Sequence, residues 1–221
     1  AQTINEEGVT IVPLDVRVVT DAAVDTTIVT AAASASGVCM TTAATLLPHE
    51  GHFGSIAESV VRSLGRPVFL LGPKAIGRVD LTNSRVIIPL DGSEAAEFIT
   101  QSAAKLADMI GAQVWVVTVV NEDQQHLAQT VTGSDFGAIE SGYVRRVARA
   151  MSKEAGGEVQ FEVLHGQDPA SAILDFADPD GIVAMSTHGR SGIGRIFAGS
   201  VTTQVVAGSH LPVLVVRPPD S

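Results

Sequence analysis

The sequence predicts an α/β protein whose main part is a five-stranded parallel sheet with helices on both faces. Short apolar runs alternate with segments of helical periodicity from residue 85 to residue 218, in the order β-α-β-α-β-α-β-α-β. The run VWVVTVV at 114–120 is apolar throughout, which is typical of a parallel strand covered on both faces. The chain is 45% hydrophobic but only 4% aromatic, as expected for such strands under alanine-rich helices. Right-handed crossovers would order these elements into one sheet.

Each element of this part has its own signal. Asp91 or Ser93 can cap the first helix, whose apolar residues recur at helical spacing as far as Ile110, and Asp168-Pro169 is a typical helix start. The polar segment 121–137 is expected to be a lid or a surface loop. The expected strands are 86–90, 114–120, 159–164, 182–185 and 213–216, and the expected helices are 93–110, 139–154, 169–177 and 200–207.

The N-terminal part is read as a separate half-domain, residues 1–84, that adds a helix and a strand to a complete domain at 85–221. Apolar residues on one helical face predict a helix at 55–64, and Gly65 and Pro67 separate it from a strand at 68–71. Residues 8–15 and 25–31 are each expected to form a short strand, and 32–54 is expected to be mainly loop.

Part of the chain repeats. Residues 54–73 and 199–218, at an offset of 145 (199 − 54), share Gly, Ser, Val, Val, Pro, Val and Pro at seven of twenty positions. Upstream, Ile28-Val29 matches Ile182-Val183 at an offset of 154, which would make the first copy's loop nine residues longer (154 − 145). IVPLD at 11–15 also resembles IIPLD at 87–91, which suggests an internally deleted tandem.

The segment 182–200, IVAMSTHGRSGIGRIFAGS, predicts an anion site. A strand runs into a loop with several glycines and the cations Arg190 and Arg195, and a helix starts at Ser200. Glycines let backbone N–H groups approach a ligand closely, and a helix N-terminus offers unpaired N–H groups and the positive end of its dipole. The alternative is a plain connection between strand and helix.

Charge and composition exclude several function classes. A net charge of −10 and a pI near 4.9 argue against nucleic acid or an anionic membrane as a partner. No apolar run reaches the roughly 18 residues of a membrane helix, and no signal segment is visible, so we expect a cytoplasmic protein. Cys39 is alone, and His49, Glu50 and His52 are too few and unsuitably spaced for a metal site.

Four motifs in order carry a family likeness: VIIPLDGS at 86–93, G-x-D-P at 166–169, STHGRSG at 186–192, and AGSV followed by LPVLVVRP. Together they resemble the universal stress protein family of the ATP-binding type, whose fold is Rossmann-like and similar to adenine-nucleotide alpha hydrolases. Residues 1–84 then resemble the C-terminal half of a degenerate second copy. The family's phosphate pattern is Gly-x-x-Gly, nine residues, then Gly-Ser or Gly-Thr. Gly189 and Gly199-Ser200 fit this pattern, but Ser186 replaces its first glycine.

The resemblance implies a nucleotide site. Asp91 would accept hydrogen bonds from the ribose, Val119 would meet the adenine edge, and Gly189, Arg190, Gly199, Ser200 and Val201 would hold the phosphates. The other expected contact positions are Pro89, Leu90, Met185, Ser186, His188, Gly192 and Arg195. Three of these residues have simpler alternatives: Asp91 as a helix N-cap, Val119 as core, and His188 as a residue that orients the loop.

The resemblance also implies a role and a pairing. We expect a stress-response regulatory protein that binds ATP, with or without Mg²⁺, and hydrolyses it slowly at most, since the glycine loop has no lysine. The alternative is a non-nucleotide dimerisation module of the same fold. A hydrolase or ligase would need SGGxDS after the first strand, and a dehydrogenase would need G-x-G-x-x-G. Family members pair their last strands antiparallel in a dimer, so 68–71 and 213–216 are expected to meet within one chain or across a homodimer.

Overall fold

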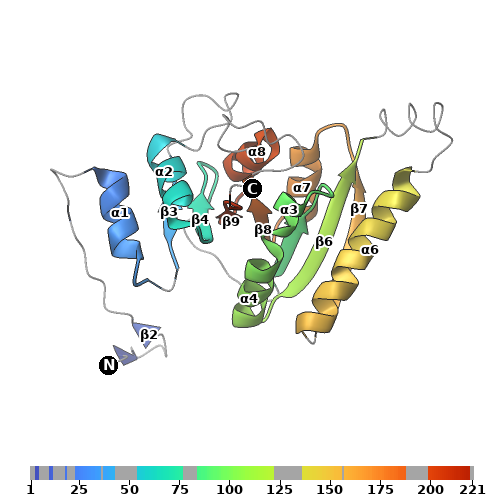
Figure 1. Cartoon of the computed structure of the whole chain (residues 1–221), viewed down its shortest axis with the longest axis horizontal. Helices are drawn as coiled ribbons and strands as arrows, with labels where there is room; N and C mark the ends of the chain where they lie inside the picture. The colour runs from blue at the N-terminus through green and yellow to red at the C-terminus, as the bar shows by residue number, and fades with distance from the viewer. Residues whose placement is uncertain are drawn as a thin grey trace.

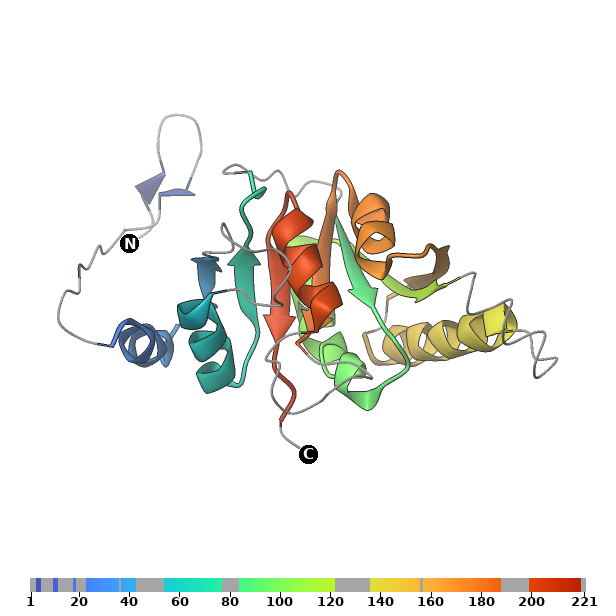
Figure 2. The ribbon, with the colours of Figure 1, turned by 90° about the horizontal axis from the view of Figure 1, so that it is seen from above.

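The computed structural model describes residues 3–4, 10–11, 18, 23–35, 37–42, 54–76, 84–121, 136–155, 157–187 and 199–219. Most of these residues build one twisted sheet with helices packed on it (Figure 1). A small antiparallel pair at the N-terminus, β1 (Thr3–Ile4) and β2 (Thr10–Ile11), stands apart from this sheet in both ribbon views (Figures 1 and 2). Apart from Thr10 and Ile11, the strand expected at 8–15 lies outside the described residues.

The main sheet has seven strands, not the five expected, in the order β3-β4-β9-β8-β5-β6-β7. The five strands of the C-terminal part are all parallel, as predicted. Two further strands join because β4 pairs antiparallel with β9, with Val68 opposite Val215, and this is the intrachain pairing that the repeat predicts. The strands are β3 (Cys39–Thr41), β4 (Val68–Leu71), β5 (Arg85–Pro89), β6 (Gln113–Val120), β7 (Val159–His165), β8 (Gly181–Ser186) and β9 (Val213–Val216).

Each face of the sheet has its own core. On one face, alternate residues of the central strands, such as Val86 and Ile182, pack with α3 (Glu94–Glu97), α4 (Thr100–Ile110) and α6 (Phe136–Ala155). On the other face, Ile87 and Val183 pack with α7 (Pro169–Ala177), α8 (Ser200–Gly208) and α2 (Ser55–Leu64). The two-residue alternation along each strand divides the side chains between the two cores.

The expected helix 93–110 is divided into α3 and α4 by a turn at Phe98 and Ile99. Ile99 is fully buried and keeps a helical backbone. The hydroxyl of Thr100 donates to the Glu97 carbonyl over 2.8 Å, so a side chain takes an acceptor at the division.

The prediction of a strand at 25–31 is wrong, because Val24–Ala32 is helix α1. Its contacts come from distant residues. The Ser59 hydroxyl donates to Asp25 in the first turn, and the Arg66 guanidinium donates to the carbonyls of Ala32 and Ala35 at the other end. Packing of α1 along α2 supplies the rest. These tertiary contacts override the β preference of Thr, Ile and Val.

The loop expected at 32–54 contains strand β3, which the sequence analysis missed. Cys39 lies parallel to Phe69 of β4 and Thr41 to Leu71, and the Thr42 amide donates to the Leu71 carbonyl over 2.9 Å. The strand is short and weakly apolar, so its partner determines its conformation.

Two α-β-α-β segments of the chain match at a constant offset of 145. Helix α1 starts 145 residues before α7 (169 − 24), and α2 starts 145 residues before α8 (200 − 55). β3 and β4 have the same register as β8 and β9, since Cys39 pairs with Phe69 and Ala184 with Leu214. The sequence match at 154 is therefore wrong: Ile28 lies in α1, and the connections 43–53 and 188–198 have equal lengths.

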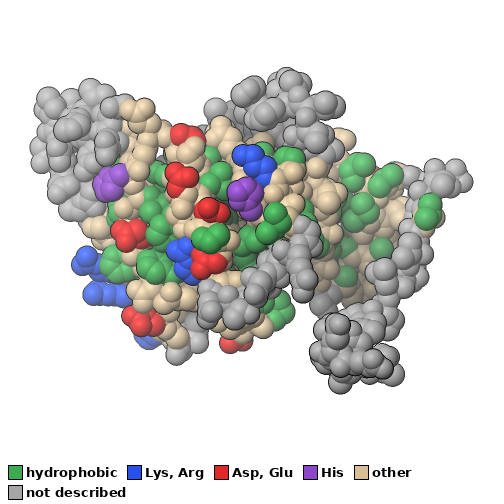
Figure 3. All heavy atoms as spheres, turned by 180° about the vertical axis from the view of Figure 1, so that it is seen from behind, with side chains coloured by type: hydrophobic (Ala, Val, Ile, Leu, Met, Phe, Trp, Pro, Cys, Tyr) green, Lys and Arg blue, Asp and Glu red, His purple; other side chains and the backbone are tan. Residues whose placement is uncertain are grey.

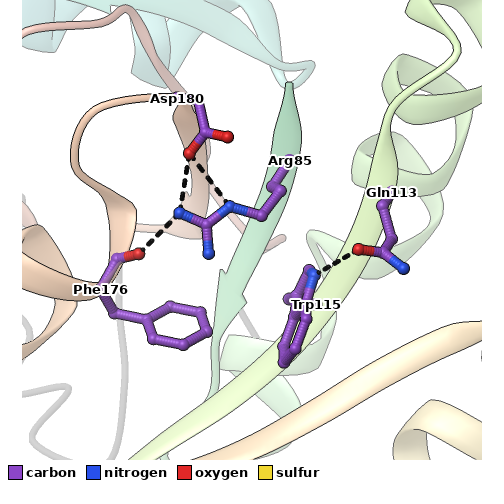
Figure 4. Close-up of polar contacts among 5 residues, drawn as sticks. All are labelled: Arg85, Gln113, Trp115, Phe176 and Asp180. Atoms are coloured by element: carbon purple, nitrogen blue, oxygen red, sulfur yellow. Dashed lines mark hydrogen bonds and ion pairs between the residues drawn. The ribbon is translucent and has the colours of Figure 1, made fainter. Parts of the chain in front are cut away.

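Arg85 fastens the amino end of β5 to the segment after α7 (Figure 4). Its guanidinium donates twice to Asp180 Oδ1, at 2.8 and 3.1 Å, and to the Phe176 carbonyl at 3.0 Å. The same guanidinium lies 5.2 Å from the centre of the Phe176 ring, whose other contact is the edge-on Trp115 ring at 5.5 Å. This cluster is at the end of the sheet opposite the carboxyl ends of the parallel strands.

Candidate functional site

The carboxyl ends of β5, β6 and β8 lie at one edge of the sheet, because these strands are parallel. Met185 belongs to the core under α7 and α8, and Val119 and Val201 pack against it partly buried. Pro89 lies two residues beyond Ile87 of the same core and is half-buried. The sequence-predicted apolar contacts Pro89, Val119, Met185 and Val201 therefore gather at this edge on the α7/α8 face.

Leu90 and Ser186 lie on the opposite face of the sheet. Leu90 is buried in the core beside α3 and α4, and its amide donates to the Val117 carbonyl over 2.8 Å. The buried Ser186 hydroxyl donates to the Ala96 carbonyl of α3 over 3.4 Å. Only the backbone of these two residues remains for a ligand on the α7/α8 face.

Asp91 is fixed by the residues that follow it. Its Oδ1 accepts hydrogen bonds from the Ser93 amide at 3.0 Å and the Ser93 hydroxyl at 2.6 Å, across Gly92 at φ +85°. Ser93 in turn caps α3 by accepting from the Ala96 amide at 3.1 Å. Ser93, not Asp91, is therefore the N-cap, and the half-buried Asp91 carboxylate is held directly beyond β5.

The start of α8 is tied to the end of β8. The Gly199 amide donates to the Thr187 carbonyl over 2.8 Å, and the Thr202 hydroxyl donates to the Ser186 carbonyl over 3.2 Å. Ser200 is exposed at the first position of α8. The nine-residue helix thus presents its first turn, with its unpaired N–H groups, at the same edge as Asp91.

Gly199 is a glycine at a position where the described fold does not require one. Its φ of −60° and ψ of 150° suit any residue, and an added Cβ would meet only the Thr187 carbonyl oxygen, at 3.8 Å. The contrast is Gly181, where a Cβ would lie 2.4 Å from Ile87, and Gly72, where it would lie 1.8 Å from a backbone oxygen of α8. The glycine at 199 leaves space at the N-terminus of α8.

The remaining sequence-predicted contacts, His188, Gly189, Arg190, Gly192 and Arg195, lie outside the described residues. Sequence reasoning missed Thr187, which is fully buried and joins two elements: its amide donates to the Val216 carbonyl and its carbonyl accepts from Gly199. A signal was present, since Thr42 stands 145 residues earlier and bonds to Leu71 in the same way.

A second missed residue is Tyr143 on α6. Its hydroxyl donates to Glu97 over 2.9 Å. Burial raises the pKa of Tyr143, and the hydrogen bond and charge of Glu97 and the charge of Asp91 raise it further. Tyr143 therefore stays a neutral donor near the Asp91 side of the site. Its place on a helical repeat gave no indication of this contact.

A separate hollow of about 250 Å³ lies at the other end of the sheet, between α7, α8 and the segment after β4. Lys74, His210, Asp175 and Asp178 line it with both signs of charge. Charges of both signs are also interspersed on the face shown in Figure 3, without a broad basic area. The part of the chain that the structure describes contains no group of three metal-binding side chains and no helix able to cross a membrane.

Comparisons with known proteins agree with the fold. The chain is 30% identical over 142 residues to a universal stress protein of Methanocaldococcus jannaschii, and covers 82% of it. It is 28% identical over 172 residues to a universal stress protein of Synechocystis, and spans about half (53%) of that longer chain. A solved universal stress protein from Archaeoglobus fulgidus matches 89% of this chain and 66% of its own, at 20% identity and a TM-score of 0.57.

That structural likeness concerns the fold alone, and it extends beyond the C-terminal part, since 89% of the chain exceeds the 136 residues (217 − 82 + 1) of the family match. The family model of universal stress proteins matches residues 82–217, more than half of the sequence. Together with the parallel β5–β9 sheet and its carboxyl-edge motifs, this match shows that the chain belongs to the universal stress protein family.

Proposed function

We propose that this chain is a stress-response regulatory protein that binds an adenine nucleotide, ATP, at the carboxyl edge of β5, β6 and β8. The observation that carries the proposal is the unneeded glycine at 199, which leaves space in front of the first turn of α8. Helix N-termini are suited to phosphate, because their N–H groups and dipole face the anion.

The other described residues at this edge suit the rest of the nucleotide. The Asp91 carboxylate, held by Ser93, would accept hydrogen bonds from the ribose hydroxyls. Pro89 and Val119 would supply apolar contact for the adenine ring, and Val201 would flank the phosphates beside Ser200. His188, Gly189, Arg190, Gly192 and Arg195 would complete the phosphate contacts from the connection 188–198, with Mg²⁺ as a companion of the phosphates.

The proposed role of the nucleotide is regulatory. Within the residues described at the carboxyl edge, Asp91 is the carboxylate closest in sequence to the site motifs, and its Oδ1 is engaged by Ser93. No lysine occurs between 182 and 200 to neutralise a transferring phosphoryl group. We therefore propose that ATP binding changes conformation or partner choice, with slow hydrolysis at most.

We further propose that residues 1–84 are the degenerate C-terminal half of a second family domain, and residues 85–221 the complete one. Support comes from the constant offset of 145 that relates α1, β3, α2 and β4 to α7, β8, α8 and β9. The β4–β9 pairing then acts as an intramolecular pseudo-dimer contact. A homodimer through β9 would have to displace β4.

Calorimetric titration of the whole chain with ATP·Mg tests the nucleotide proposal. We expect binding by the wild type, and at least about tenfold weaker binding by Gly199→Val, whose branched side chain fills the phosphate space. Thermal unfolding should show that this variant stays folded, since only one atom lies within 4 Å of its Cβ. The control is Gly157→Val, which has open space around its Cβ and lies on the far side of α6 from the site.

The competing proposal is a dimerisation module of the same fold that binds no nucleotide. The absence of ATP binding by the intact chain would favour it. Equal binding by the wild type and Gly199→Val would place the nucleotide elsewhere and overturn the site.

A further inference from the structure

Strand β3 forms one end of the seven-stranded sheet and is paired on one side only among the described residues. Cys39 and Thr41 are exposed, whereas their counterparts at the offset of 145, Ala184 and Ser186, are buried at 0% and 7% exposure. The two strands have the same register with β4 and β9. They differ because β8 has a second neighbour.

That second neighbour is β5, which pairs in parallel with β8 and places Ile87 beside Val183. β5 also covers α7: Ile173 of α7 is 2% exposed and shares a core with Ile87. The counterpart of Ile173 is Ile28 on α1 (173 − 145), which is only half-buried. The N-terminal unit therefore lacks a strand at the place that β5 takes in the C-terminal unit.

The chain contains a segment with the sequence of that strand. Residues 11–15, IVPLD, match 87–91, IIPLD, at four of five positions and an offset of 76 (87 − 11). The segment begins in β2, which pairs with β1 through one edge and has its other edge unpaired in the part of the chain that the structure describes. In the structure this hairpin stands apart from β3 (Figure 2).

We propose that β2 and the residues after it dock in parallel on the free edge of β3, as β5 docks on β8. The hairpin need not open, because β1 would occupy the side of β2 that faces away from β3. The link from Asp15 to α1 spans up to about 27 Å, which suffices to reach the start of a helix packed over both strands. The crossover through α1 would have the same hand as the crossover from β7 through α7 to β8.

The repeat fixes the register of this docking. Ile87 lies beside Val183, so the two offsets place Ile11 beside Val38 (87 − 76 and 183 − 145). The next residues are then Val12 beside Cys39. Neighbouring strands are about 4.8 Å apart, within the Cα separation that a disulfide tolerates. This pairing does not depend on nucleotide binding.

The test uses Val12→Cys in the full chain, where Cys39 is the natural and single cysteine. Partial burial raises the pKa of the Cys39 thiol, so mild oxidation is carried out at about pH 9 to provide thiolate. We expect an intrachain disulfide, seen as a monomer of increased mobility on a non-reducing gel and as a 12–39 cross-linked peptide. The matched control is Ile11→Cys, whose side chain would point to the other face of the strand.

The expected result is cross-linking of Val12→Cys about tenfold faster than of Ile11→Cys, because docking gives the paired thiols a high effective concentration. Circular dichroism confirms that both variants are folded. Equal rates for the two variants, or no intrachain product, would overturn the docking. A disulfide between two chains would also overturn it, since the free edge would then receive a second copy.

Discussion

The Gly199 amide and the Thr187 carbonyl are joined by a hydrogen bond of 2.8 Å, so the two ends of the connection 188–198 are held together. Thr187 is fully buried and is itself anchored to Val216 of β9. The start of α8 is thereby set at the carboxyl edge of β8, next to the strand that ends in Asp91. This arrangement makes the roles of individual residues at the edge testable one at a time.

Asp91→Asn is expected to weaken ATP binding about tenfold. A hydrogen bond to a charged group contributes about 1.5–3 kcal/mol and one between neutral groups about 0.5–1.5 kcal/mol, so the amide keeps part of the ribose contact. The free energy of unfolding should change little, because the Asn carbonyl can still accept from Ser93. Titration calorimetry and urea unfolding measure the two effects.

The control for charge alone is Asp108→Asn, which removes an exposed carboxylate from α4. Its ATP affinity should equal that of the wild type. If both variants bind ATP as the wild type does, Asp91 does not contact the nucleotide.

Arg85→Ala is expected to lower the free energy of unfolding by about 2 kcal/mol and to leave ATP affinity unchanged. The variant loses the hydrogen bonds to Asp180 and Phe176 and the contact with the Phe176 ring. The ion pair itself contributes modestly, since the Asp180 side chain is 42% exposed. Urea unfolding checks the prediction against Arg149→Ala, an exposed arginine of α6 for which a loss below about 0.5 kcal/mol is expected. A loss of ATP affinity in Arg85→Ala would show that the two ends of β5 are coupled.

Most of the C-terminal sheet could be predicted from the sequence, because its strands are continuous apolar runs and its helices have regular apolar faces. β3 and α1 could not. The sequence CMT has little strand preference of its own and depends on β4, while DTTIVTA prefers strand locally but is held as helix by Ser59 and Arg66.

At the candidate site, the position of Asp91 and the start of α8 followed from the motifs, and the structure places both at one edge. The tie through Thr187 could not be predicted, because it uses backbone atoms that any residue would supply. The orientation of Ser186 toward α3 depends on which face each residue of β8 presents, and this is fixed by the register of the whole sheet.

The N-cap of α7 predicts a pH-dependent contribution to stability. Hydrogen bonds from the hydroxyl and amide of Ser171, at 2.6 and 3.0 Å, lower the pKa of Asp168. A lowered pKa in the folded state means that the stabilisation is present above the unfolded value, near 3.9, and is lost as pH falls through the folded value. Asp168→Ala should therefore destabilise by about 1 kcal/mol at pH 7, and the difference from the wild type should narrow below about pH 4.

Urea unfolding at several pH values measures this difference. Asp168→Asn is the matched control, because it keeps a capping oxygen but cannot titrate. A gap between wild type and Asp168→Ala that stays constant from pH 7 to about pH 3 would contradict the prediction.

Ser186→Gly tests whether the serine obstructs the nucleotide, since the family pattern has glycine at this position. The Ser186 side chain lies buried on the α3 side of the sheet and donates to Ala96, away from the α7/α8 face where Val119 and Val201 lie. We therefore expect ATP affinity to stay within about twofold of the wild type, while stability falls by about 1 kcal/mol because glycine weakens a strand. Thr41→Gly, the counterpart in β3 at the offset of 145, gives the cost of a strand glycine away from the site. A tenfold or greater gain in affinity for Ser186→Gly alone would show instead that the hydroxymethyl group restricts the approach of the phosphates to β8.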